Sequence, residues 1–182
     1  MGGDPLSLDR AVDRAKCGEA TAFSAIYDEF SPRLHTYAYH LLGNRQDAED
    51  VIQETFLKAL QSLHQLRDSD RLESWLYAIA SHRCLDLLRR RSRIWWIPLS
   101  RRPREIRAED HIEGTDEADL VQQALRRLPP KDAMCLSLRH TDGFSCSEIA
   151  EIMRTSPTAI WSRLSRARAK FIEAYDSLKE KA

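Results

Sequence analysis

Apolar residues recur every three or four positions along most of this chain, and that spacing limits the folds open to it. It is the spacing of one face of an α-helix. No segment shows the alternation of apolar and polar residues that marks a half-buried strand. The 182 residues include 6 glycines and 7 prolines, which favours long helices and few turns. The sequence therefore predicts an all-α fold.

The first two helices are predicted over 20–42 and 46–63. Pro32 marks either a break or a new helix start within the first of them. One face of the second helix forms an apolar stripe of Ala48, Val51, Ile52, Thr55, Phe56, Ala59, Leu60 and Leu63. A polar loop follows, and then a capping box in which Asp70 is the N-cap and Glu73 folds back on it. The helix that this box opens continues to residue 91.

The second half of the chain carries the same kind of start and stop signals. Ser145 and Glu148 form a capping box, and Ser156 followed by Pro157 is typical of an N-cap and a first helical position. The predicted helices span 116–128, 131–140 and 145–153, with a last one from residue 157.

Helical periodicity is lost between the two halves, where Pro98 and Pro103 fall and the charge changes from basic to acidic. We expect two small helical domains joined by a flexible linker. Inside this linker Trp95-Trp96-Ile97 is an apolar island that either packs on a domain or docks on a partner or on bases. The expected division is an N-terminal extension at 1–19, a first domain at 20–91, the linker at 92–115 and a second domain at 116–182.

Charge is balanced overall, with 28 basic and 28 acidic residues, but it is unevenly distributed. Residues 89–107 contain eight arginines and one acid, whereas 109–119 contain six acids and neither lysine nor arginine. Residues 47–54 contain four acids and no base. These runs are either solvated helix surfaces or separate faces for separate partners.

The chain contains no apolar run long enough to span a membrane and begins with no secretory signal, so we expect no direct membrane insertion and a cytoplasmic location. Its four cysteines, at positions 17, 84, 135 and 146, show no CxxC spacing. We therefore expect no metal and no cofactor. Catalysis by Cys84 with His82 is an alternative, but Cys84 lies in an apolar helical stripe that would bury it, so we expect no enzyme.

The helices at 145–153 and from residue 157, with the turn at 154–156, form a predicted helix-turn-helix. Such a unit places its second helix in the major groove of DNA, although a helical hairpin with a basic solvated face would give the same pattern. The outward side of the second helix offers Trp161, Ser162, Ser165, Arg166 and Lys170, with Arg163 and Arg168 beside them.

Taken together, four stretches resemble the extracytoplasmic-function (ECF) sigma factors of the bacterial sigma-70 family. They are 23–30 (FSAIYDEF), 47–56 (DAEDVIQETF), 75–80 (WLYAIA) continuing to Asp86 and Arg89-Arg90-Arg91, and Leu128-Pro129 followed by Glu148-Ile149-Ala150 and 162–168 (SRLSRAR). The resemblance implies a sigma factor that brings core RNA polymerase to specific promoters. It further implies work in stress or envelope responses under an anti-sigma factor. A stand-alone helix-turn-helix regulator is the alternative, but it would leave the acidic segment at 47–54 without a role.

For the first domain the resemblance implies sigma region 2. The residues matching those that pack on a coiled coil of the polymerase β′ subunit are Asp47, Glu49, Asp50, Gln53 and Glu54. Carboxylates on one face suit a basic partner, although acids in the first turns also compensate the helix dipole.

The residues implied in recognising and melting the −10 element are Leu66, Arg67, Asp68, Leu72, Arg83, Arg89, Arg90 and Arg91. Leu66 and Leu72 stand where the family often has phenylalanine, which bears on the base preference of the pocket that captures a flipped base.

For the second domain the resemblance implies sigma region 4, which reads the −35 element and contacts the polymerase β flap. The matching DNA-contacting residues are Arg139, Ser156, Thr158, Trp161, Ser162, Ser165, Arg166 and Arg168. Trp161 replaces a usual lysine or arginine and cannot donate two hydrogen bonds to guanine, so we expect an unusual −35 sequence.

Overall fold

The computed structural model describes residues 5–94 and 116–180, and every regular element in them is helical. The elements are α1 (Pro5–Lys16), α2 (Ala20–Leu42), α3 (Arg45–Ser62), the 3₁₀ turns η1 (Leu63–Gln65) and η2 (Ser69–Arg71), α4 (Leu72–Ile94), α5 (Asp116–Arg127), α6 (Pro130–His140), α7 (Cys146–Ile152) and α8 (Pro157–Lys179). The predicted all-α class is confirmed. The Trp95-Trp96-Ile97 island, and the predicted linker from residue 95 on, lie outside the described residues.

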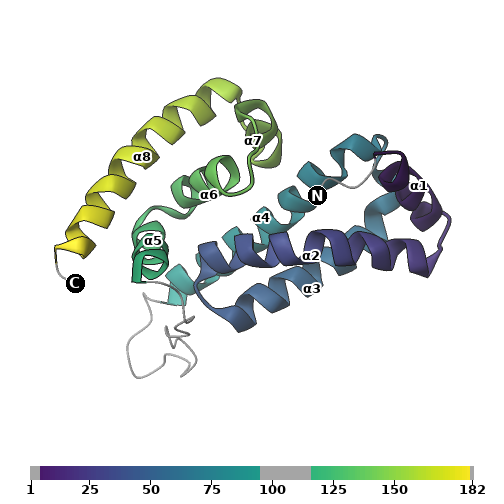
Figure 1. The fold of residues 1–182 in the computed structure, drawn as a ribbon, viewed down its shortest axis with the longest axis horizontal. Helices are drawn as coiled ribbons and strands as arrows, with labels where there is room; N and C mark the ends of the chain where they lie inside the picture. The colour runs from purple at the N-terminus through teal and green to yellow at the C-terminus, as the bar shows by residue number, and fades with distance from the viewer. Residues whose placement is uncertain (1–4, 95–115, 181–182) are drawn as a thin grey trace.

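Helices α2, α3 and α4 form the core of the first domain and pack on one another along most of their length (Figure 1). Helix α2 continues through Pro32 without interruption, so both the predicted break and the alternative of a new helix start are wrong. It ends at Gly43, which takes the left-handed conformation with φ 68°. Asn44 then caps α3 by accepting a hydrogen bond from the Asp47 amide at 2.9 Å.

Helix α1 is an addition to the predicted elements and belongs to the same bundle, because it packs on α2. Val12 and Ala15 are buried in the common core, and Leu8 and Ala11 pack against it. Their spacing is helical. Because aspartates and arginines stand between them, however, this short apolar stripe is hard to recognise in the sequence.

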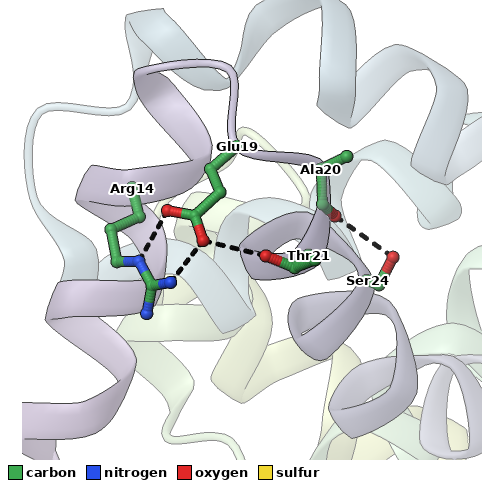
Figure 2. A network of polar contacts seen from close by, with 5 residues as sticks. All are labelled: Arg14, Glu19, Ala20, Thr21 and Ser24. Atoms are coloured by element: carbon green, nitrogen blue, oxygen red, sulfur yellow. Dashed lines mark hydrogen bonds and ion pairs between the residues drawn. The ribbon is translucent and has the colours of Figure 1, made fainter.

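A polar network joins the end of α1 to the start of α2 (Figure 2). Arg14 forms an ion pair with Glu19, and the Thr21 hydroxyl donates to the same carboxylate at 2.8 Å. The hydrogen bond from Arg14, then the one from Thr21, lowers the pKa of Glu19. Ser24 donates to the Ala20 carbonyl at 3.1 Å. The bonds to Glu19 fix the tight turn between the two helices, whereas the Ser24 bond lies within the first turn of α2.

Two local predictions in the first domain are wrong. Asp68, rather than Asp70, caps the short turn before α4 by accepting from the Asp70 amide at 3.1 Å, and Glu73 pairs instead with Arg33 at 2.7 Å. Leu60 is not in the inner stripe of α3 but points to solvent. A 3₁₀ turn precedes α4, so the capping geometry moves toward the N-terminus by two residues.

Helices α5 to α8 form the second domain. Helix α8 packs along α5 and α6 and crosses α7. The predicted capping box at the start of α7 is confirmed, because Ser145 accepts from the Glu148 amide at 3.2 Å and Glu148 accepts from the Ser145 amide at 2.8 Å. Ser156 caps α8 as predicted, accepting from the Ala159 amide at 3.2 Å.

The two domains pack against each other, with α5 and α6 against α2, and α7 against α4 (Figure 1). The Tyr77 hydroxyl of α4 donates to Asp142 Oδ1 at 2.7 Å, and its ring meets Phe144 edge-on with centroids 4.8 Å apart. The Gln122 amide of α5 donates to the carbonyls of Tyr39 and His40, both at 3.1 Å. The hydrophobic core is therefore continuous from one domain to the other.

Candidate functional site

The helix-turn-helix consists of α7, the turn at 153–156 and α8. Helix α7 ends in a Schellman motif, in which the Thr155 amide donates to the Ala150 carbonyl at 2.9 Å and the Arg154 amide to the Glu151 carbonyl at 3.2 Å. Arg154 takes the left-handed conformation, with φ 51°, at the position where glycine is usual. The turn therefore has a fixed geometry, and it sets the start of α8.

In the first turns of α8, the side chains on one side of the helix are buried and those on the other side are exposed. Ile160, Leu164 and Ala167 are buried, which anchors the helix. The residues expected to face DNA are all exposed: Ser156, Thr158, Trp161, Ser162, Ser165, Arg166 and Arg168. Trp161 is 68% exposed. The hydroxyl of Ser156 already serves as the cap of α8, so its first contribution is to position the helix.

Several basic side chains of this domain already have partners. Arg139 donates to the Phe144 carbonyl at 3.0 Å, which ties α6 to the loop before α7. Arg168 lies 3.3 Å from His140 Nε2. Burial, together with the positive charges of Arg168 and Arg139, lowers the pKa of His140, so its imidazole favours the neutral form that can accept this hydrogen bond.

Asp132, on α6, binds α8 through both carboxylate oxygens. Its Oδ1 accepts from Arg163 at 2.7 Å and its Oδ2 from Lys170 at 2.9 Å. Asp132 is only 6% exposed, and burial favours its neutral form. The hydrogen bonds from Lys170 and Arg163 outweigh that cost and lower the pKa of Asp132. Lys170, expected on the outward side, is thus turned toward α6.

A second exposed face lies on α3, in the first domain. Glu49, Asp50, Gln53 and Glu54 are exposed, and Asp47 is partly buried. The same face continues with Leu57 and Leu60, which are 59% and 54% exposed. The sequence pattern did not single out these two leucines as functional, although their spacing of three residues from Glu54 and from each other places them on one side of the helix.

The acidic residues of α3 line a groove with the basic residues of α4. Asp47 forms an ion pair with Arg91, and Glu54 lies 3.4 Å from Arg83. The groove is lined by Asp47, Asp50, Val51, Glu54, Arg83, Asp86, Leu87 and Arg90. Two sets of residues that the sequence assigned to different partners, the polymerase and the −10 element, thus meet at one boundary.

The loop expected to capture a base of the −10 element has a mixed surface. Arg67 and Asp68 are exposed, but Leu66 and Leu72 are 7% and 0% exposed and belong to the core. In this conformation neither leucine offers its side chain to a base. The adjoining Arg71 lies 3.4 Å from Glu151 of α7, so the second domain reaches this loop.

An apolar hollow of about 260 Å³ lies between α5, α6 and α8. It is lined by Val121, Leu125, Leu136, Ser137, His140, Thr141, Arg168 and Phe171. The sequence did not predict this hollow, because it depends on how three helices separate rather than on the pattern of any one of them.

The fold combines a helix-turn-helix, whose second helix is exposed along one side of its first turns, with a separate acidic face on α3, and a helix-turn-helix is typical of transcription factors. The chain matches the family model of sigma-70 region 2 over residues 26–94 and that of sigma-70 region 4 over residues 118–171. It belongs to the sigma-70 family, in the ECF group of RNA polymerase sigma factors. Members of this family are transcription initiation factors whose two regions bind core RNA polymerase and promoter DNA.

Similar proteins include the ECF sigma factor SigW of Bacillus subtilis, 24% identical over 90% of this chain and 94% of that protein. BldN of Streptomyces coelicolor is 34% identical over 90% of this chain and 64% of its own length. Among solved structures, CnrH in complex with the cytosolic domain of CnrY is 24% identical, with a TM-score of 0.72 over 94% of this chain and 98% of that chain. RpoE of Bartonella quintana, in complex with the anti-sigma factor NepR, is 24% identical, with a TM-score of 0.71 over 85% of this chain and 96% of that chain. At this identity the two structures show a shared fold.

No helix among the described residues is long and apolar enough to cross a membrane. Within the same residues, no three histidine, cysteine or acidic side chains gather as a metal site would require.

Proposed function

We propose that this chain brings core RNA polymerase to its promoters through faces on two domains, with residues 20–91 acting as region 2 and 116–182 as region 4. The observation that carries the proposal is the exposed strip at the start of α8, held by a capped turn and a buried anchor. A helix of this kind fits the major groove, where Arg166 can bind guanine at two points.

In this proposal the exposed face of α3 docks on the coiled coil of the polymerase β′ subunit. Its carboxylates suit a basic helix, and Leu57 and Leu60 add apolar area beside them. The apolar hollow between α5, α6 and α8 is our candidate for the site that receives the β flap. Exposed Arg67 and Asp68, together with the basic end of α4, are assigned to the −10 element.

We also propose that this chain works in the cytoplasm and that an anti-sigma factor controls it. Support for such control comes from the shared fold with RpoE, whose structure was solved with the anti-sigma factor NepR bound. A catalytic role is no part of the proposal. Burial raises the pKa of the Cys84 thiol to about 12, so this cysteine is a poor nucleophile.

The test is co-elution with core RNA polymerase followed by run-off transcription on a genomic library. The charge reversals Asp50→Lys and Glu54→Lys, made together, should abolish co-elution while leaving helicity unchanged. The matched control is Asp28→Lys with Glu29→Lys, two exposed acids on α2, which should co-elute normally. A chain that binds DNA in a sequence-specific manner but never co-elutes would instead be an operator-binding regulator.

A further inference from the structure

Asp132 holds two positive charges of the recognition helix, and these charges are placed where a phosphate backbone could otherwise attract them. Arg163 directly follows Ser162 in the DNA-facing strip, and Lys170 lies two turns further along α8. Both side chains remain partly exposed, at 31% and 49%. They are therefore bound to Asp132 without being sealed off from solvent.

The geometry of these contacts also fixes how α8 lies on α6. Arg163 and Lys170 stand seven residues apart, which is about 10 Å along a helix axis, and one buried carboxylate receives both of them. Arg166 lies between them in the sequence and faces solvent. A helix tied on both sides of Arg166 has little freedom to roll or tilt.

We propose that Asp132 is a specificity-determining residue: it withholds Arg163 and Lys170 from DNA phosphates and fixes the angle at which α8 presents Trp161 and Arg166. The inference rests on the proposed reading of DNA by α8. Phosphate contacts strengthen binding to every sequence equally, whereas base contacts discriminate. An acid that prevents two phosphate contacts therefore lowers the affinity for DNA of any sequence and preserves the selectivity between sequences.

This role predicts an unusual pair of effects for Asp132→Asn. The variant keeps the shape of the side chain but removes its charge and leaves one acceptor oxygen, so at least one of the two cations is freed and binding to unrelated DNA should become tighter. The plot of log affinity against log salt should become steeper by up to about two units, because each added phosphate contact contributes about 0.9. The preference for the best sequence should fall roughly fivefold or more, the value of one base contact.

The experiment uses the full chain and two 24-bp duplexes. One duplex is recovered from a randomised pool by the wild-type chain, and the other is a shuffled sequence of the same composition. Binding is followed by fluorescence anisotropy across a salt series, at a temperature where circular dichroism shows each variant folded. The control is Asp176→Asn, which makes the same change at an exposed acid of α8 that forms no ion pair with any residue described by the structure. It should leave the preference and the slope as in the wild type.

A second variant, Arg163→Gln, keeps the inference testable if Asp132→Asn folds poorly. Because Arg163 is bound to Asp132 and not to phosphate, the salt slope should not change while the preference falls. A slope lower by about one unit would show Arg163 on a phosphate and overturn the inference, as would an unchanged preference in Asp132→Asn. A wild-type chain that recovers no preferred duplex would overturn the proposed reading by α8, and the inference with it.

Discussion

Arg154 is the residue in the helix-turn-helix whose backbone conformation is the least favourable in free energy. A non-glycine residue in the left-handed region is destabilised by roughly 1–2 kcal/mol, and Arg154 holds this conformation because two backbone hydrogen bonds close the turn around it. Its side chain is exposed. The cost therefore lies in the backbone rather than in lost contacts.

We expect Arg154→Gly to stabilise the chain by up to about 1 kcal/mol, since glycine removes the strain but loses more entropy on folding. Thermal unfolding followed by circular dichroism measures the change. Arg154→Ala retains the left-handed cost and should show no such gain, and an equal rise in both variants would refute the explanation.

Arg166 and Arg168 should differ in what they contribute to DNA binding. Arg166→Ala should flatten the preference at one or two −35 positions, because a two-point contact with guanine is worth about 1–3 kcal/mol. Arg168→Ala should weaken all sequences about equally and lower the salt slope by roughly one unit. If Arg166→Ala lowered affinity uniformly and kept the preference, Trp161 and the serines would have to carry specificity.

At the scale of single helices, α3 combines a buried stripe with an exposed surface that is partly apolar. Replacing Leu57 and Leu60 together by serine should reduce stability by no more than about 1 kcal/mol, because both side chains are more than half exposed and serine is only a slightly poorer helix former. It should weaken binding to core polymerase by about 1–3 kcal/mol, the value of burying apolar area of this size. Competition binding with labelled wild-type chain measures the loss. Ile172→Ser, at a residue of α8 that is 51% exposed, is the control and should bind normally.

Most helices could be predicted from the sequence because each carries its own signals. The Ser145 and Ser156 caps depend only on residues within one turn, and both predictions are confirmed. Helix α1 is harder to predict, since its apolar stripe is short and is buried only because the helix packs on α2. The prediction at Asp70 failed because Arg33, which is distant in sequence, takes Glu73. Long-range partners of this kind leave no local pattern.

The candidate site shows the same division. The exposed strip of α8 follows from helical spacing once Ile160 and Leu164 are assigned to the core. The partner of Arg163 and the burial of Leu66 do not follow, because each depends on a neighbouring helix. Whether the faces bind the polymerase and the two promoter elements stays a prediction.

At the scale of the whole molecule, the contact between the domains includes a carboxyl group sensitive to pH. The pKa of Asp142 is raised to about 6, chiefly by burial and to a smaller extent by the nearby Glu73, against the opposing hydrogen bond from Tyr77 and charge of Arg33. If the domains separate and water reaches Asp142, its pKa should return toward the ordinary value. The packed form therefore binds the proton more tightly than the separated form.

It follows that packing of the domains should strengthen as the pH falls through about 6 and weaken as the pH rises above it. Small-angle X-ray scattering between pH 5 and pH 8 would detect this as a larger radius of gyration at the alkaline end. Asp142→Asn can still accept from Tyr77 and cannot ionise, so its radius should be small and independent of pH. If the radius of gyration of the wild type did not change with pH, or if that of Asp142→Asn changed in the same way, Asp142 would not control the packing of the domains.

The contacts between α5 and the end of α2 are unequal in kind. In these hydrogen bonds Gln122 and Arg126 donate from their side chains, whereas Tyr39, His40 and Gly43 accept through their main-chain carbonyls. Every amino acid carries a carbonyl, so these hydrogen bonds do not depend on which side chains stand at residues 39 and 40, although Tyr39 is only 8% exposed and is held by its place in the core. Gly43 is the exception, since a β-carbon there would lie 2.2 Å from Arg126 Nε. Substitutions that break these hydrogen bonds are therefore expected at Gln122 and Arg126 of the second domain and at Gly43 of the first.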